Sequence, residues 1–180
     1  YTTIDSRMQR YAEEAVYGHV ARYLQPEFFK ENKGKPNAPF TSQLTKKQVN
    51  QIMERAVLQS ERYRILKSNG ASDEEIHKSF HTPTDMSIFT YHGDVDTTMT
   101  PIDSIRYVKS FLRAGFMSMD PTTGAVKAYV GGLDYTHFMY DMVTGGRRQV
   151  GSTIKPFLYS LAMENGFSPC DLAPNVQRTY

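Results

Sequence analysis

Apolar side chains recur at intervals of three and four residues in the first part of the chain. Over residues 5–24 this spacing predicts an amphipathic helix, with Asp5 or Ser6 available as its N-cap. The pattern stops over residues 26–42, where three prolines stand among asparagine, glycine and lysine. Because proline breaks helical hydrogen bonding, we expect an exposed loop there.

Helical spacing returns in the middle of the chain. Residues 45–69 are expected to form one helix or two joined helices that stop at an Asn-Gly pair. Ser72 stands three residues before Glu75, which is the spacing of a capping box and predicts a short helix to about residue 80. A Thr-Pro pair predicts the start of a further amphipathic helix over residues 100–112.

Two stretches alternate between apolar and polar side chains, as strands do. Residues 86–99 alternate on both sides of the glycine-containing segment 91–94, which predicts a β-hairpin. Residues 116–130 alternate on both sides of segment 120–124, whose proline and glycine favour a tight reversal. The sequence therefore predicts two separate hairpins among the helices.

The last predicted element is a helix over residues 152–165, closed by Gly166 and preceded by an irregular stretch. With the other elements it predicts the α+β class, in which helices outweigh strands. A hydrophobic fraction of 39% in 180 residues is enough for a packed core.

Composition and charge exclude several kinds of site. The 21 lysines and arginines nearly balance 19 acidic residues and are interspersed, which argues against a nucleic-acid partner. The single cysteine, Cys170, excludes an internal disulfide and a cysteine-based zinc site. His77 and His81 stand four apart without a convincing third ligand, so we predict surface histidines, no metal and no cofactor. No apolar run approaches the roughly 18 residues that cross a bilayer, and any membrane anchor is expected outside this sequence.

Ser152 and Lys155 are the candidate catalytic residues. They stand three apart at a predicted helix start, so their side chains share one face. A serine hydroxyl needs a base to become a nucleophile, and a lysine can serve when its environment disfavours the ammonium form, as a helix N-terminus does. Pro156 is compatible with Ser152 lying at or just before the first turn. The Ser-x-x-Lys spacing alone arises often by chance, and a solvated helix start explains it equally well.

The residues around this pair add specificity. Residues 147–157 closely resemble the first active-site motif of penicillin-binding proteins. Residues 119–132 resemble the hairpin that precedes this motif in the class A branch, and residues 1–9 look like the stretch that follows its glycosyltransferase domain. The three segments occur in the family's order, so the chain resembles an internal piece of a class A, bifunctional penicillin-binding protein.

The resemblance implies a division of the chain. Residues 1–113 would be a helical, pedestal-like connecting region with a β-hairpin and an insertion at about residues 26–100. Residues 114–180 would be the N-terminal part of a penicillin-binding/serine β-lactamase-like transpeptidase domain, with its first strands and active-serine helix.

The resemblance also implies a reaction, that of a serine D,D-transpeptidase. Ser152 would be the nucleophile, with its backbone N–H facing the oxyanion, and Lys155 the general base; the acyl-enzyme would cross-link peptidoglycan stem peptides, and penicillin would acylate the same serine. The family's second and third motifs, Ser-Asp-Asn and Lys-Thr-Gly, are absent from this sequence. We therefore expect the chain alone to be inactive.

Partners and location follow from the same resemblance. Stem peptides, β-lactams and an upstream glycosyltransferase domain are expected partners, on the periplasmic or extracytoplasmic side of the inner membrane in the bacterial cell envelope. One alternative is a non-catalytic interaction module that binds a cell-wall regulator, or another part of the synthase, through residues 26–100. Another is a serine β-lactamase-like hydrolase, against which the hairpin at residues 119–132 argues.

Overall fold

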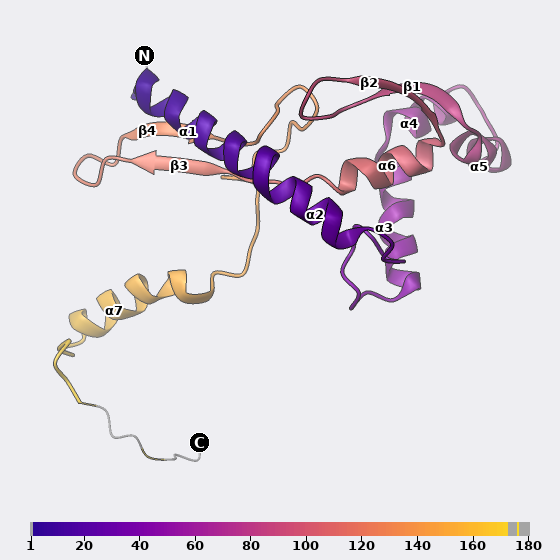
Figure 1. Ribbon diagram of the computed structural model, residues 1–180. Coiled ribbons are helices and arrows are strands. Elements are labelled where there is room, and N and C mark those ends of the chain that lie inside the picture. The colour runs from indigo at the N-terminus through magenta and orange to yellow at the C-terminus, as the bar shows by residue number, and fades with distance from the viewer. Residues whose placement is uncertain (1, 173–175, 177–180) are drawn as a thin grey trace. The chain divides into compact units, whose positions relative to one another are not determined.

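The computed structural model describes residues 2–172 and residue 176 (Figure 1). Its internal contacts divide the chain into two units, Tyr1–Gly145 and Gly146–Tyr180. Helices and two small antiparallel sheets make up the described residues, which confirms the α+β class. The boundary that we expected between residues 113 and 114 stays a prediction about family domains.

The first helical stretch of the chain continues beyond residue 24, where the sequence pattern predicted its end. Helix α1 (Ser6–His19) begins where the Asp5 carboxylate accepts hydrogen bonds from two backbone N–H groups, as expected of an N-cap. A π-helical turn (Val20–Leu24) then leads directly into α2 (Gln25–Asn32). The loop predicted to begin at residue 26 was therefore wrong over its first part. Pro26 lies in the first turn of α2, at the junction with the π turn, where its missing N–H is tolerated.

Three helices follow in the middle of the chain. The predicted segment 45–69 forms two joined helices, α3 (Lys46–Gln59) and α4 (Glu61–Ser68). They separate at Ser60, whose extended backbone and hydroxyl cap the start of α4. Helix α5 (Asp73–His81) begins with the predicted capping box of Ser72 and Glu75.

The first predicted hairpin is confirmed. Strands β1 (Thr84–Ile88) and β2 (Val95–Met99) pair antiparallel, and helix α6 (Pro101–Lys109) follows with Thr100 as its N-cap. The α6 helix ends before residue 112, where we had expected its end. One reason is a buried side chain from another helix.

That side chain is Gln25 of α2, which is 1% exposed. Its Nε2 donates to the carbonyl of Ser110 at 2.9 Å, and its Oε1 accepts from the N–H of Leu112 at 2.8 Å. These bonds satisfy backbone groups that a longer helix would have paired internally. The amide of Gln25 thus fixes the point at which the chain leaves α6.

The second hairpin packs on the first helix. Strands β3 (Phe116–Met119) and β4 (Val126–Val130) pair antiparallel with an irregularity near the turn, and α1 lies along β4 (Figure 1). Ala12, Ala128 and Val130 are buried between them, with Val16 packed alongside. This contact fixes the second hairpin to the helix that opens the chain.

Aromatic side chains join α2, α6 and the connection between β1 and β2. Phe111, which is buried, packs edge to face against Phe29, Phe89, Tyr91 and Tyr107. Phe138, from the segment after β4, joins the same cluster. Such edge-to-face pairs each add about 0.5–1.5 kcal/mol beyond area burial.

The second unit contains a 3-10 turn (Gly151–Ile154) and helix α7 (Lys155–Glu164). Phe157, Tyr159 and Leu161 are each more than half exposed. Apolar side chains surround the α7 helix, and a helix of this kind is normally buried inside a larger domain.

Candidate functional site

The structure places Ser152 and Lys155 on consecutive turns of one helical segment. Ser152 lies in the 3-10 turn, and Lys155 is the first residue of α7, with Pro156 in its first turn. The expected helix start is therefore present, with Ser152 just before the α-helix. Residues three apart in a 3-10 turn lie nearly in line, which keeps both side chains on one face.

A left-handed glycine and short backbone bonds shape the turn at the serine. Gly151 has a φ of 52°, a conformation that residues with a Cβ seldom adopt, and it directly precedes Ser152. The N–H of Thr153 donates to the carbonyl of Val150 at 3.1 Å, and the N–H of Lys155 donates to the carbonyl of Ser152. The local backbone of the motif is thus defined without help from distant residues.

The side chains of the pair face water. Ser152 and Lys155 are exposed, and in the described part of the chain neither the serine hydroxyl nor the lysine ammonium has a hydrogen-bond partner. The N–H of Ser152 likewise donates to no described group. It is therefore free to face an oxyanion, while the burial that a lysine base needs would have to come from other residues.

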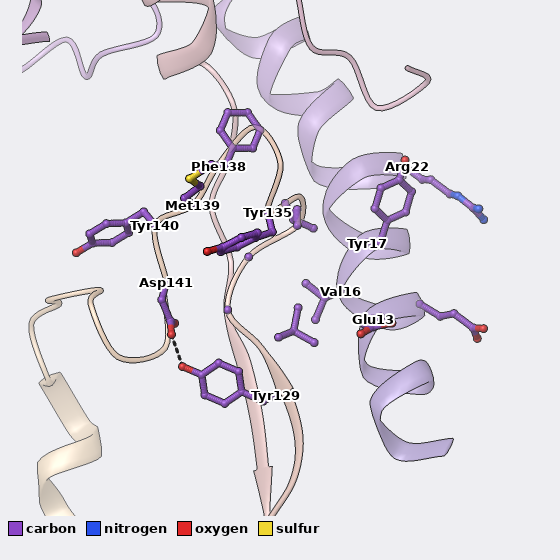
Figure 2. A pocket seen from close by; sticks show the side chains of 15 residues that line it. Glu13, Val16, Tyr17, Arg22, Tyr129, Tyr135, Phe138, Met139, Tyr140 and Asp141 are labelled. Atoms are coloured by element: carbon purple, nitrogen blue, oxygen red, sulfur yellow. Dashed lines mark hydrogen bonds between the residues drawn. The ribbon is translucent and has the colours of Figure 1, made fainter. Parts of the chain in front are cut away.

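An aspartate organises the chain between β4 and the end of the first unit. The Asp141 carboxylate accepts a hydrogen bond from the Tyr129 hydroxyl (Figure 2). It also accepts hydrogen bonds from the Thr144 hydroxyl and from the N–H groups of Val143 and Thr144. These donors, the Tyr129 hydroxyl first, lower the pKa of Asp141 to about 2. We did not single out Asp141 from the sequence, although an aspartate before Met-Val-Thr-Gly-Gly fits a turn closed by its own side chain.

A cavity of about 940 Å³ lies between α1 and the segment after β4 (Figure 2). Tyr17 and Glu13 line it from α1, and Tyr135, Phe138 and Tyr140 line it from the other side. Neither Ser152 nor Lys155 is among its lining residues. The cavity belongs to the first unit alone.

The two histidines and the cysteine noted in the sequence are exposed side chains. The rings of His77 and His81 stack with centroids 4.1 Å apart. Over residues 2–172, no three histidine, cysteine, aspartate or glutamate side chains form a group that could hold a metal ion. Cys170 is exposed and unpaired. In the same residues no helix has the length and apolar character needed to span a bilayer.

Comparison with known proteins shows which family parts of the chain resemble. Residues 35–112 match the family described as the penicillin-binding protein middle domain. Over 71 residues the chain is 42% identical to penicillin-binding protein 2D of Bacillus subtilis (strain 168), which covers 39% of the chain and 10% of the relative. Over these partial stretches the chain is similar to class A penicillin-binding proteins. The family resemblance predicted from the sequence motifs is thereby confirmed.

Further relatives agree with this resemblance. The chain is 47% identical over 53 residues to penicillin-binding protein 1A of Vibrio cholerae, with 29% of the chain and 6% of the relative covered. It is 40% identical over 65 residues to penicillin-binding protein 1A of Escherichia coli (strain K12), with 36% of the chain and 8% of the relative covered. These matches span a tenth or less of each relative, and no solved structure matches the chain.

The family match also bears on the middle of the segment. It covers helices α3 to α6 and the hairpin of β1 and β2, most of the stretch that we predicted as an insertion. These elements therefore have counterparts in penicillin-binding proteins. The roles of Ser152 and Lys155 lie outside the matched residues and stay predictions.

Proposed function

We propose that this segment belongs to a peptidoglycan synthase and contains the nucleophile, Ser152, and the general base, Lys155, of a serine D,D-transpeptidase. The observation that most supports this is the turn at Gly151–Ile154, which places Ser152 just before a helix and Lys155 one turn later. The resemblance to penicillin-binding proteins supports a role in cell-wall synthesis. The geometry of the turn supports a serine nucleophile with a lysine as its base.

The first half of the reaction forms an acyl-enzyme. Lys155 accepts the proton of the Ser152 hydroxyl as the serine oxygen attacks the carbonyl carbon of the penultimate D-alanine in a stem peptide. The N–H of Ser152, free among the described residues, donates to the oxyanion. The carbon–nitrogen bond to the terminal D-alanine breaks, and that amine leaves with a proton.

The second half transfers the acyl group. An amine from a neighbouring stem peptide attacks the ester carbonyl, the bond to the Ser152 oxygen breaks, and the serine regains its proton. A β-lactam would follow the first half only: its ring amide opens on Ser152 and leaves a covalent adduct. The same serine would therefore account for substrate turnover and for penicillin binding.

The exposed surfaces of the segment support a larger domain around the serine. Helix α7 displays Phe157, Leu158 and Leu161 to water, and β3 displays Phe116 and Met117 on a two-stranded sheet. We propose that β3, β4 and α7 are the opening elements of a penicillin-binding/serine β-lactamase-like transpeptidase domain. Other strands and helices of that domain would cover them.

The segment alone is expected to have negligible activity. The second and third motifs would supply a proton-shuttling serine and a second oxyanion donor, and neither occurs in this sequence. Loss of one such donor reduces the rate by about 100- to 1000-fold. Exposure of Lys155 to water would weaken its role further.

The proposal extends to the setting of the whole protein. We place it in the bacterial cell envelope, on the periplasmic or extracytoplasmic side of the inner membrane, with an upstream glycosyltransferase domain. A second candidate function is an interaction module for cell-wall regulators. It is favoured by the family match, which treats residues 35–112 as a domain distinct from the Ser152 motif.

Labelling with a fluorescent penicillin, followed by intact mass, tests the catalytic proposal. It should be run on this segment and on a longer form of the protein that includes the further motifs, each with Ser152→Ala. Ser160→Ala is a matched control, because Ser160 lies on α7 and, among the described residues, its hydroxyl bonds only to the carbonyl of Pro156. Labelling of the longer form that disappears with Ser152→Ala alone is expected. A folded longer form that is inert would overturn the assignment and favour the interaction module.

A further inference from the structure

A histidine in the first unit lies between two carboxylates. The Nδ1 atom of His137 is 2.9 Å from Oδ1 of Asp134, and its Nε2 atom is 3.1 Å from Oδ1 of Asp94. The N–H of His137 also donates to Asp134 at 2.8 Å. Each ring nitrogen therefore faces a carboxylate oxygen, although none of these side chains belongs to the Ser152 motif.

The two carboxylates belong to different parts of the chain. Asp134 and His137 lie in the turn after β4, whereas Asp94 lies 43 residues before His137, in the connection between β1 and β2. That connection is inside the region matched by the middle-domain family. Figure 1 shows the orange loop after β4 against this connection. The bond of His137 to Asp94 thus joins the middle domain to the segment that continues toward Ser152.

This arrangement suits the protonated form of the ring. A neutral imidazole donates from one nitrogen only, whereas an ionised carboxylate only accepts, so a neutral His137 would leave one nitrogen lone pair facing an oxygen. An imidazolium donates from both nitrogens. The hydrogen bond to Asp134, followed by that to Asp94, raises the pKa of His137 above its usual value.

The other groups around the ring do not change charge near neutral pH. The ring packs against Phe89 with centroids 4.8 Å apart, and the Arg113 guanidinium lies over Phe138, 3.5 Å from the ring centre. Burial raises the pKa of Tyr91, which therefore stays neutral, and burial lowers the pKa of Arg113, whose guanidinium still stays charged. Burial acts to raise the pKa of Asp134, but hydrogen bonds from His137 outweigh this effect and lower that pKa, so its carboxylate stays ionised. His137 is therefore the group beside it whose charge changes near neutral pH.

We propose that His137 is a pH-dependent clasp, which holds the turn at residues 134–138 to the connection between β1 and β2 when protonated and weakens this contact when neutral. The clasp goes beyond the proposed transpeptidase chemistry, because it controls how firmly the chain before the Ser152 motif is attached to the middle domain. Its ligand is a proton, and no further partner is required.

The sign of the effect follows from the direction of the pKa shift. A folded pKa above the unfolded value of about 6.5 means that the stabilisation is complete below that value and is lost as the pH rises through the folded pKa. The contact should therefore hold at pH 5.5 and weaken by pH 8.5.

NMR titration of the histidine rings in this chain tests the first part of the proposal. The His137 midpoint is expected above 6.5, and Asp94→Asn should lower it by about half a unit to one unit, because an adjacent opposite charge favours the imidazolium. His92→Gln is a matched control, since His92 lies in the same connection and has no hydrogen bond from its ring among the described residues. A midpoint at or below 6.5, or one that Asp94→Asn leaves unchanged, would overturn the proposal.

Limited proteolysis of residues 131–145 tests the second part. The cleavage rate, normalised to an unfolded peptide at each pH, should rise several-fold between pH 5.5 and pH 8.5 in the wild-type chain and in His92→Gln. In His137→Gln it should be high at both values. If that variant does not fold, Asp94→Asn supplies the same comparison. Equal pH dependence in the wild type and Asp94→Asn would show that the histidine is only structural and would overturn the clasp.

Discussion

The side-chain amide of Gln9 pairs with the backbone of Tyr129 as a neighbouring strand would. Its Oε1 accepts from the N–H of Tyr129 at 2.7 Å, and its Nε2 donates to the carbonyl at 2.8 Å. The N–H of Asp5 donates to the carbonyl of Lys127, and the hydroxyl of Thr3 donates to the carbonyl of Val126, both on β4. The residues before α1 and the Gln9 side chain thereby cover the β4 edge of the second hairpin, whereas the β3 edge has no partner strand among the residues that the structure describes.

An open β3 edge predicts self-association of the isolated segment. Unpaired strand edges with exposed apolar side chains pair readily with other chains, and Met117 on β3 is 43% exposed. Sedimentation velocity should show a weight-average mass that rises with concentration, and Met117→Lys should reduce this rise. Leu158→Lys makes the same test on α7, because that helix also exposes apolar side chains. A monomer at every concentration would contradict the prediction.

Replacement of Gln25 should destabilise the first unit. Gln25→Met keeps the volume but leaves the carbonyl of Ser110 and the N–H of Leu112 without partners at a buried site. An unsatisfied buried group costs about 1–3 kcal/mol, so we expect a loss of about 2–4 kcal/mol in the free energy of unfolding by urea. Gln51→Met, on the exposed face of α3, should change it by less than about 0.5 kcal/mol. Equal effects of the two substitutions would refute the role given to Gln25.

Asp141 should stabilise the first unit only where it is ionised. Its folded pKa of about 2 lies below the unfolded value of 3.8, so its contribution is present above pH 3.8 and is lost as the pH falls toward 2. The free energy of unfolding should be higher for the wild type than for Asp141→Asn at pH 6, and the difference should shrink by pH 3. Asp96→Asn, exposed on β2, is the matched control for the loss of one surface carboxylate. A difference that stays constant with pH would contradict ionisation as the cause.

Lys155→Met should slow acylation without unfolding the protein. If Lys155 is the general base, a longer form of the protein with all three motifs should react with penicillin about 100- to 10,000-fold more slowly after this substitution. The rate is measured as the time course of covalent labelling. Lys109→Met, at the exposed end of α6, is the control and should label normally. Normal labelling of Lys155→Met would assign the base to another residue.

Much of the local structure could be predicted from the sequence, because its causes lie within a few residues. Ser72 and Glu75 cap each other, Thr100 caps α6, and alternating side chains define both hairpins. The helical turn at Ser152 has the same local origin, in Gly151 and Pro156. Hydrogen bonds between neighbours along the chain are set by spacing alone.

Other features depend on which distant segments meet, and only the tertiary structure decided them. The helix continues past Pro26 through a π turn, and Gln25 then reaches the end of α6. His137 meets Asp94 across 43 residues, and Gln9 meets Tyr129 across 120. A polar side chain has the same local pattern whether it faces water or a distant backbone, because burial and long-range partners are properties of the folded chain. The sequence therefore determined the family resemblance, most of the elements and the Ser-x-x-Lys turn, and the tertiary structure decided the polar contacts that hold these elements together.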